Sequence, residues 1–203
     1  MIPLVLATRS AGKLRELRPL FAARGLPVVD LEEAGIPESS DEDALEAYES
    51  FEENALAKGR YFHRLTGRPV VADDSGIVVA ALGGAPGVRS KRWSGRPDLA
   101  GQALDDANNA LLMTRLAGVT DRAAHYVAVA VYVDDAREVV RRGEVHGRVV
   151  AAAPRGASGF GYDPFFISDE LGKTFGEASA AEKARVSHRA RAFTALLDAL
   201  TTG

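Results

Sequence analysis

Residues 125–150 read HYVAVAVYVDDAREVVRRGEVHGRVV and contain a long Val-rich run. Residues 125–133 are apolar almost throughout, residues 134–137 are typical of a turn, and the apolar pattern resumes over residues 139–150. β-branched residues favour strands, and two such runs joined by a short polar turn are typical of a hairpin. The stretch therefore predicts an antiparallel hairpin within a mixed sheet.

Shorter segments on both sides of this hairpin predict alternating strands and helices. Short apolar runs indicate buried strands, and leucines at helical spacing indicate helices with one apolar face. The expected strands are residues 2–7, 27–31 and 69–72, and the sequence is apolar again over residues 77–82. The expected helices are residues 11–24, 43–65, 98–116 and a last helix after Ser187. The pattern predicts an α/β fold.

Length and composition limit the classes of protein that the chain can belong to. With 203 residues and 46% hydrophobic content, the chain can bury one sizeable core, so we expect a single domain over residues 1–203. A net charge of −3 disfavours extended binding to nucleic acid. No apolar stretch approaches the length of a membrane span, so we expect no membrane partner and a cytoplasmic protein. The absence of cysteine excludes disulfides, a thiol nucleophile and a thiolate zinc site.

The first candidate for chemistry is the segment between the first expected strand and the first expected helix. It contains Thr8, Arg9, Ser10, Ala11, Gly12 and Lys13. Backbone N–H groups at the start of a helix attract anions, and Lys13 adds a positive charge. The spacing is not that of a Walker A loop. An ordinary capped helix start with a solvated lysine is the alternative interpretation.

Acidic residues gather in two places. Glu46, Glu49 and Glu53 have the i, i+3, i+7 spacing of one helical face, and Asp73 and Asp74 follow an apolar strand. A helix glutamate and a strand-end aspartate suit Mg²⁺, which takes one or two protein carboxylates together with water and phosphate oxygens. The alternatives are a solvated helix face and a turn closed by the DDSG side chains.

Two further blocks contain residues suited to a nucleobase. The glycine-flanked block GFGYDPFF carries Phe160, Gly161, Tyr162 and Asp163, and exposed aromatic rings there could stack on a base. If Ser187 caps the last helix, His188 and Arg189 lie in its first turn and could donate hydrogen bonds to ligand carbonyls. The alternatives are a hydrophobic plug and a pair of surface residues on a continuous helix.

Six blocks in order resemble the inosine/xanthosine triphosphate pyrophosphatase family from residue 4 to about residue 193: LATRSAGKLREL, SFEENALAKGR, VADDSG, LGGAPGVRSKRWSG, GFGYDPFF and EKARVSHRARA. The resemblance implies an elongated α/β fold with a long, mixed, twisted sheet and flanking helices, two lobes around a central cleft, and a homodimer. It implies Mg²⁺-dependent cleavage of XTP, ITP and dITP to the monophosphate and pyrophosphate, by water attack at the α-phosphorus. Such an activity keeps deaminated purines out of DNA and RNA.

The resemblance also implies roles for individual residues. Asp74 matches the catalytic carboxylate, and Glu46 with Asp74 matches the metal ligands. The substrate-binding positions are Thr8, Arg9, Ser10, Ala11, Gly12, Lys13, Ser75, Phe160, Gly161, Tyr162, Asp163, Lys183, His188 and Arg189. Ser10 stands where the family usually has Asn, and EAYES at residues 46–50 departs from the usual ETGxT.

Three other functions remain open at this point. A regulatory nucleotide-binding module would not need Glu46, Asp73 and Asp74. A single-stranded nucleic-acid binder that stacks bases on Phe160 and Tyr162 would need a basic groove, which the sequence lacks. The runner-up among enzymes is a related pyrophosphatase that acts on modified pyrimidine triphosphates.

Overall fold

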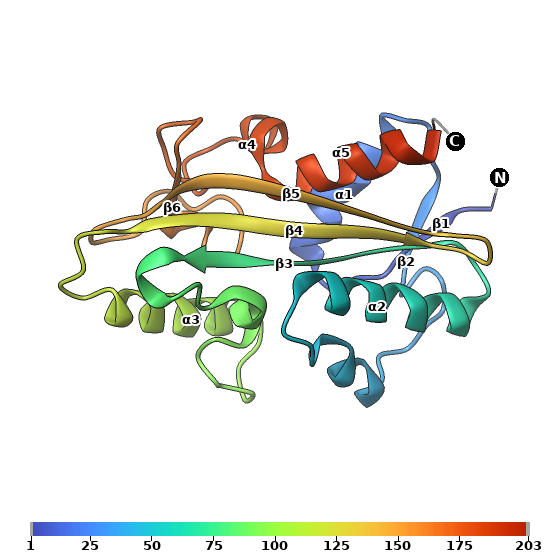
Figure 1. Cartoon of the computed structure of the whole chain (residues 1–203), viewed down its shortest axis with the longest axis horizontal. Coiled ribbons are helices and arrows are strands. Elements are labelled where there is room, and N and C mark those ends of the chain that lie inside the picture. Colours follow the sequence, from blue (N-terminus) through green and yellow to red (C-terminus); the bar gives the residue numbers. More distant parts are fainter. Residues whose placement is uncertain (1, 202–203) are drawn as a thin grey trace. The chain divides into compact units, whose positions relative to one another are not determined.

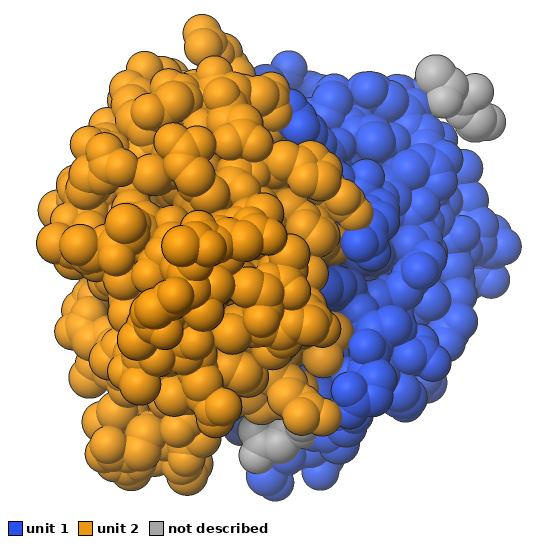
Figure 2. Space-filling model, turned by 60° about the vertical axis from the view of Figure 1, so that its left-hand side comes forward, with its two compact units in different colours: residues 1–74, 128–143, 188–203 blue, residues 75–127, 144–187 orange. Residues whose placement is uncertain are grey.

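The structure is a computed structural model that describes residues 2–201, with Asp43 described by its backbone only. Met1, Thr202 and Gly203, which complete the expected domain, lie outside the described residues. The chain divides into two compact units, coloured separately in Figure 2. Unit 1 contains the chain up to Asp74, residues 128–143 and the segment from His188 onward, and unit 2 contains residues 75–127 and 144–187.

In the described part of the chain, six strands form one sheet in the order β2-β1-β3-β4-β5-β6 (Figure 1). Their bounds are β1 Leu4–Leu6, β2 Val28–Asp30, β3 Val70–Val79, β4 Ala123–Val133, β5 Glu138–Val149 and β6 Phe166–Ser168. Strand β1 pairs in parallel with β2 and β3, whereas β5 pairs with β6 in the antiparallel sense. The expected mixed sheet is therefore confirmed, and β4 and β5 form the expected hairpin, with the Asp134 N–H donating to the Arg137 carbonyl at 3.1 Å.

Helices cover both sheet faces of unit 1. Helices α1 (Ala11–Ala22) and α5 (His188–Thr201) lie on one face, and α2 (Phe51–Thr66) lies on the other (Figure 1). The sequence explains this arrangement, because alternate residues of β4 meet different helices. Ala128 and Ala130 belong to the core with α1 and α5, whereas a Cβ at Gly59 of α2 would lie 2.9 Å from Val133. A strand covered on both sides has no solvent face, which accounts for its unbroken apolar run.

Unit 2 has its own core. Helix α3 (Gly101–Arg115) and the short helix α4 (Ala180–Val186) lie on opposite faces of its part of the sheet (Figure 1). Leu112 of α3 packs in a buried cluster with Ile77, Tyr126 and Phe166. Short 3-10 helices complete the chain at η1 (Ser40–Glu46), η2 (Ala80–Leu82), η3 (Gly87–Arg92) and η4 (Asp163–Phe165).

The expected helix over residues 43–65 is wrong in its first part. The chain forms η1, breaks, and restarts as α2, because Ser50 caps the new helix by accepting from the Glu53 N–H at 3.2 Å. Glu46 ends η1 and Glu49 lies in the break, so Glu46, Glu49 and Glu53 do not share one helical face.

The expectation that a strand ends at Asp73 and Asp74 is also wrong. Strand β3 continues through both residues to Val79, so DDSG is not a turn. β3 lies between β1 and β4, and both carboxylates are buried, with 1% and 5% exposure. A polar pair can remain inside such a strand because each side chain has hydrogen-bonding partners. No helix in residues 2–201 is both long and apolar enough to cross a bilayer.

Candidate active site

The 8–13 segment forms the start of α1. Ser10 is the N-cap, and its hydroxyl accepts from the Lys13 N–H at 3.3 Å. The Thr8 hydroxyl accepts from the Ser10 N–H at 3.2 Å, and Gly12 is buried in the first turn. The helix start is capped, as the alternative interpretation expected, but Lys13 is not solvated, because its side chain is only 15% exposed. The same geometry leaves the N-terminal end of a helix beside Lys13, which is the arrangement that attracts phosphate.

Asp73 lies at the centre of a buried ion cluster in unit 1. Lys13 Nζ is 3.0 Å from Asp73 Oδ1, and Arg189 Nε donates to Asp73 Oδ2 at 3.2 Å. Arg189 also contacts Glu16, with 2.5 Å between Nη1 and Oε2, and its side chain is only 3% exposed. Arg189 and Lys13, expected to bind different ends of a ligand, are therefore linked through one aspartate.

Asp74 has a different set of contacts. Asn54 Nδ2 donates to Asp74 Oδ2 at 3.0 Å, and Asn54, which is fully buried, also hydrogen-bonds both backbone groups of Tyr48. Lys58 Nζ lies 2.8 Å from Glu46 Oε1 and donates to the Asp73 carbonyl at 3.1 Å. Glu46, at the end of η1, and Asp74, in β3, therefore both contact side chains of α2.

The two neighbouring aspartates differ in their affinity for protons. Burial raises the pKa of Asp73, but the charges of Lys13, Arg189 and Lys58 outweigh it and hold the pKa far below the ordinary value. Burial raises the pKa of Asp74 as well, and there the lysines do not compensate, so its pKa stays above the ordinary value. Asp73 therefore serves as a fixed negative charge, whereas Asp74 is the carboxylate that would gain most from a bound cation.

The two lysines also differ. Burial lowers the pKa of Lys13, and the attraction of Asp73 only partly opposes that effect. Burial lowers the pKa of Lys58 too, but Glu46, Asp74 and Asp73 outweigh it and the pKa is raised. Carboxylate or carbonyl oxygens bind both ammonium groups, so each lysine has a partner when no ligand is bound. The same two groups could bind a polyanion.

The carboxylates around α2 fit a hard cation. Glu46 adds to the raised pKa of Asp74, which indicates two mutually repelling carboxylates. No group of three or more His, Cys, Asp or Glu side chains in metal-binding geometry occurs among the residues that the structure describes. Two carboxylate oxygens with no nitrogen or sulfur ligand are the donor set of a cation such as Mg²⁺, which completes its shell with water and phosphate.

In unit 2, the glycine-flanked loop and α4 meet at a second buried ion pair. Lys183 Nζ lies 2.5 Å from Asp163 Oδ2 and 5.0 Å from the centroid of the Phe160 ring. The same carboxylate oxygen accepts from the Phe160 N–H at 2.9 Å. A Cβ at Gly159 would lie 2.0 Å from Asp163 Oδ2, so only glycine fits there. Three residues expected to bind substrate are therefore brought together.

The remaining residues of the two base-related blocks are mostly buried. Tyr162 is 5% exposed, packs in the core of unit 2 and donates its hydroxyl hydrogen to the Ser90 carbonyl at 2.7 Å. Phe166 is also in that core. Helix α4 ends at Val186 and α5 begins at His188, so the expected break at Ser187 is confirmed. His188 and Arg189 occupy the first turn of α5, each 3% exposed.

Arg9 has an acidic partner of its own, Glu42. The Arg9 guanidinium binds Glu42 through two nitrogens, at 2.7 and 3.2 Å, and donates to the Ile36 and Pro37 carbonyls, each at 2.9 Å. These contacts fasten the segment before η1 to the 8–13 segment. Ser75 follows Asp74 in β3, is half-buried and belongs to unit 2.

Sequence reasoning did not assign Glu16, Asn54 or Lys58 to the site. Asn54 and Lys58 are four residues apart on α2, which places them on one face, and this spacing was the available signal. Glu16 gave no such signal, because its contact with Arg189 joins residues 173 positions apart.

The fold and site define a mixed α/β protein in which a helix N-terminus, two lysines and a carboxylate pair are suited to phosphate and a hard cation. The family is shown by comparison with known proteins: the sequence model of the Ham1 family matches residues 4–199, and the chain belongs to that family.

Similar proteins support this membership over the full length. A protein named dITP/XTP pyrophosphatase from Ralstonia nicotianae is 51% identical over 201 residues, which cover 97% of this chain and 96% of that protein. A protein of the same name from Mycolicibacterium paratuberculosis is 48% identical and covers 100% and 97%. The structure of a HAM1 protein from Coxiella burnetii matches with a TM-score of 0.85, 32% identity and 100% coverage of both chains.

Proposed function

We propose that this protein hydrolyses the non-standard purine nucleoside triphosphates XTP, ITP and dITP to the monophosphate and pyrophosphate. Its full-length similarity to proteins named dITP/XTP pyrophosphatase supports the substrate class. The observation that carries the chemistry is the gathering of Lys13, Lys58, Asp73 and Asp74 beside the start of α1. Removal of these nucleotides from the pool would keep deaminated bases out of DNA and RNA.

The roles of the residues in unit 1 follow from their chemistry. The N–H groups of Arg9, Ala11 and Gly12 bind phosphate oxygens, and Lys13 with Lys58 neutralises charge that develops on the leaving pyrophosphate. Glu46 and Asp74 would hold Mg²⁺, which would neutralise part of the charge of the triphosphate. Asp74 orients the water that attacks the α-phosphorus, and no covalent intermediate on the protein is required.

Recognition of the base belongs to two groups of residues. Phe160 offers a half-buried ring next to Asp163 and Lys183, and a purine stacked on such a ring gains about 1–3 kcal/mol. His188 and Arg189, at the start of α5, donate toward the 6-oxo group of the purine. ATP carries an amino donor at that position, so donor would face donor and ATP would be rejected.

The place of action and the assembly complete the proposal. An enzyme that cleans the nucleotide pool acts where nucleotides are used, so we place it in the cytoplasm, without a nucleic-acid or membrane partner. We propose a homodimer, which sedimentation or light scattering would distinguish from a monomer by a doubled mass.

One experiment tests the whole proposal. The protein is incubated with XTP, ITP, dITP, ATP, GTP and modified pyrimidine triphosphates, with and without Mg²⁺, and monophosphate, diphosphate, phosphate and pyrophosphate are quantified separately. We expect pyrophosphate and monophosphate from the first three substrates, and only with Mg²⁺. Preference for a pyrimidine triphosphate, or release of free phosphate, would overturn the proposal.

A further inference from the structure

Helix α3 holds both peptide groups that flank Gly161. Asp105 Oδ2 accepts from the Gly161 N–H at 2.8 Å, and Asn109 Nδ2 donates to the Gly161 carbonyl at 3.0 Å. Asp105 and Asn109 are four residues apart on α3, so their side chains leave the helix from the same face. One residue of the loop is therefore held at its N–H and at its C=O by two neighbouring side chains of one helix.

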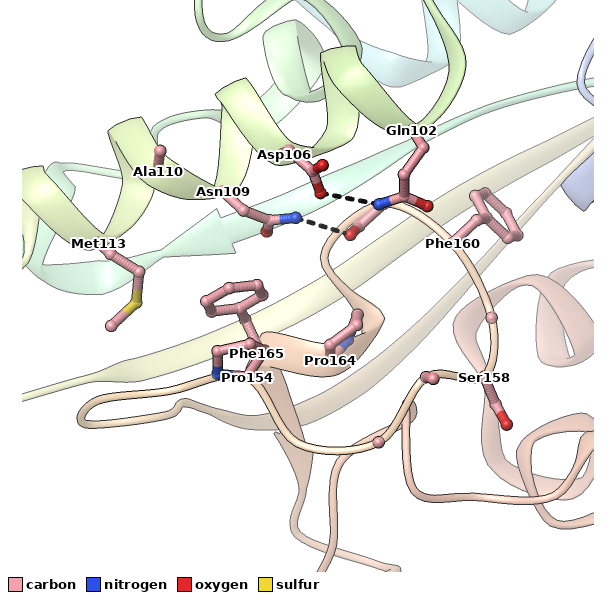
Figure 3. A pocket seen from close by; sticks show the side chains of 14 residues that line it. Gln102, Asp106, Asn109, Ala110, Met113, Pro154, Ser158, Phe160, Pro164 and Phe165 are labelled. Atoms are coloured by element: carbon pink, nitrogen blue, oxygen red, sulfur yellow. Dashed lines mark hydrogen bonds between the residues drawn. The ribbon is translucent and has the colours of Figure 1, made fainter.

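The space beside this contact is hollow. A cavity of about 460 Å³ lies between α3 and the loop, with Gln102, Asp106 and Met113 on the helix side and Pro154, Ser158 and Phe165 on the loop side (Figure 3). Side chains that filled this space would fix the loop by packing, but an open cavity contributes no such contacts. On the side that faces α3, Gly161 is therefore held by hydrogen bonds rather than by packing.

The hydrogen bond to Asp105 acts on the residue before Gly161, and the hydrogen bond from Asn109 fixes the peptide group on the other side of Gly161. The N–H that binds Asp105 belongs to the peptide group that joins Phe160 to Gly161, so the plane of that peptide fixes the backbone from which the Phe160 ring projects. The Phe160 N–H is bound on the other side by Asp163 at 2.9 Å. Gly161 has a φ of 62°, a left-handed conformation that glycine adopts readily.

We propose that Asp105 and Asn109 are positioning residues that hold the Phe160 ring in place and thereby set how tightly the purine base binds. The inference rests on the proposed function, because it assumes that Phe160 stacks on the base. Both residues would act through Gly161: Asp105 is half-buried and accepts from the Gly161 N–H, and Asn109, 4% exposed, donates to the Gly161 carbonyl. Burial raises the pKa of Asp105, and the Gly161 N–H opposes that effect.

The test compares ligands with and without a base in matched variants. The variants are Asp105→Ala and Asn109→Ala, each of which removes one hydrogen bond to Gly161. Asp106→Ala is the control, since Asp106 lies on the same helix and lines the same cavity but binds Gln102 instead. Asp105→Asn is the conservative variant, because the amide oxygen can still accept from the Gly161 N–H.

Two measurements are made on ligand-free protein and on its complexes with IMP and with pyrophosphate. Hydrogen exchange followed by NMR should be about tenfold faster at the Gly161 amide in Asp105→Ala, as expected when a hydrogen bond to a charged group is lost. The Kd for IMP should rise by about tenfold in both alanine variants, whereas the Kd for pyrophosphate, which has no base, should change less than twofold. Asp106→Ala and Asp105→Asn should resemble the parent protein.

The outcomes separate this inference from the proposed function. If the parent protein binds neither IMP nor ITP, the proposed function fails. If the parent binds IMP and both alanine variants bind it equally well, or if Gly161 exchanges at the parent rate in Asp105→Ala, the positioning role is overturned. Equal weakening of IMP and pyrophosphate would also overturn it, since that result indicates a general structural defect. If Asn109→Ala does not fold, the results for Asp105→Ala alone test the inference. That variant should fold, because the Asp105 side chain that it removes is only half-buried.

Discussion

Two adjacent residues, Asp73 and Asp74, show how a strand separates two roles. Side chains that follow one another in a strand point to opposite faces, so the two carboxylates meet different partners. Asp73 is bound by Lys13 and Arg189, and Asp74 is bound by Asn54. The first pair of contacts neutralises a charge within the fold, and the second fixes one carboxylate oxygen while the proposed metal would use the other.

Replacing Asp74 by Asn should remove activity without unfolding the protein. The amide has the same shape and can still accept from Asn54, but it cannot bind a cation as a carboxylate does. We expect turnover of ITP to fall by about 10²–10⁴-fold, the usual range for loss of a catalytic acid or base, with an almost unchanged melting temperature. Turnover at saturating Mg²⁺ and thermal unfolding measure the two effects. Near-normal turnover would show that another carboxylate is catalytic.

Arg189→Ala should affect both stability and selectivity. Removal of the guanidinium leaves Asp73 and Glu16 short of a buried partner, and breaking such a pair typically costs about 3–5 kcal/mol of unfolding free energy. If Arg189 also donates a hydrogen bond to the 6-oxo group, kcat/KM for ITP falls by a factor that corresponds to about 1.5–3 kcal/mol. The low kcat/KM for ATP hardly changes. Denaturant unfolding and kinetics with both substrates measure these effects.

The ratio of kcat/KM for ITP to kcat/KM for ATP shows whether Arg189 recognises the base or only stabilises the fold. Equal losses of kcat/KM for ITP and ATP would mean that the residue supports the ion cluster only. Asp73→Asn serves as the comparison, since it disrupts the same cluster without removing a donor to the base. It should lower stability and reduce the ITP rate less than Asp74→Asn does.

Secondary structure elements were predicted from the sequence where one local pattern determines them. The β4–β5 hairpin, α1, α3 and the break before α5 all appear where periodicity and turn residues indicate them. The break between η1 and α2 was missed, because it depends on Ser50 capping a helix inside a segment with continuous helical propensity. The length of β3 was missed as well, since burial of Asp73 and Asp74 is possible only with partners from other elements.

The site was predictable to the same extent. Lys13 and Asp74 were assigned to the candidate site from short motifs, whereas the contact between Lys183 and Asp163 was not predicted, because each block was interpreted separately. The contact of Arg189 with Asp73 spans 116 positions, and no local pattern encodes such a pairing. The same holds for the hydrogen bond from Asn54 to Asp74, which exists only because α2 packs beside β3.

In α4, the contacts of Glu182 should make the stability of the protein depend on pH. Its hydrogen bond with Lys173, together with the N–H and hydroxyl of Ser179, lowers its pKa to about 2. A depressed carboxyl pKa adds stability above the unfolded value of 4.5, and this contribution is lost as the pH falls toward 2. Glu182→Gln should therefore lower the melting temperature at pH 7 and match the parent near pH 2. A difference that persists at low pH would contradict the charge effect.

Contacts between elements predict opposite results for two glycines of unit 1. A Cβ at Gly143 of β5 would lie 2.3 Å from the His188 carbonyl oxygen and 2.5 Å from the Ala192 nitrogen, both backbone atoms of α5. Gly143→Ala should force the helix away and cost about 1–3 kcal/mol. At Gly59 the neighbours are valine methyl groups, and alanine gains about 1 kcal/mol of helix propensity, so Gly59→Ala should be nearly neutral. Urea unfolding of both variants tests the contrast, which equal losses would contradict.

Across the whole molecule, binding of phosphate is a local property. The chain carries a net charge of −3, so its overall field does not attract a polyanion. The proposed function therefore relies on Lys13, Lys58 and the start of α1, together with the cation proposed at Glu46 and Asp74. This arrangement suits a small triphosphate that fits within reach of a few groups, and it does not suit a nucleic-acid backbone with many phosphates.

The last prediction concerns which bond of the triphosphate breaks. Attack at the α-phosphorus leaves the oxygen of the attacking water on the monophosphate and expels unlabelled pyrophosphate. Hydrolysis of ITP in water enriched in heavy oxygen should therefore label IMP alone, as measured by mass spectrometry of both products. The reaction must be free of contaminating pyrophosphatase, which Asp74→Asn prepared in the same way controls for. Label in pyrophosphate would place the attack at the β-phosphorus, and Asp74 would then have to orient water toward a different phosphate from the one we propose.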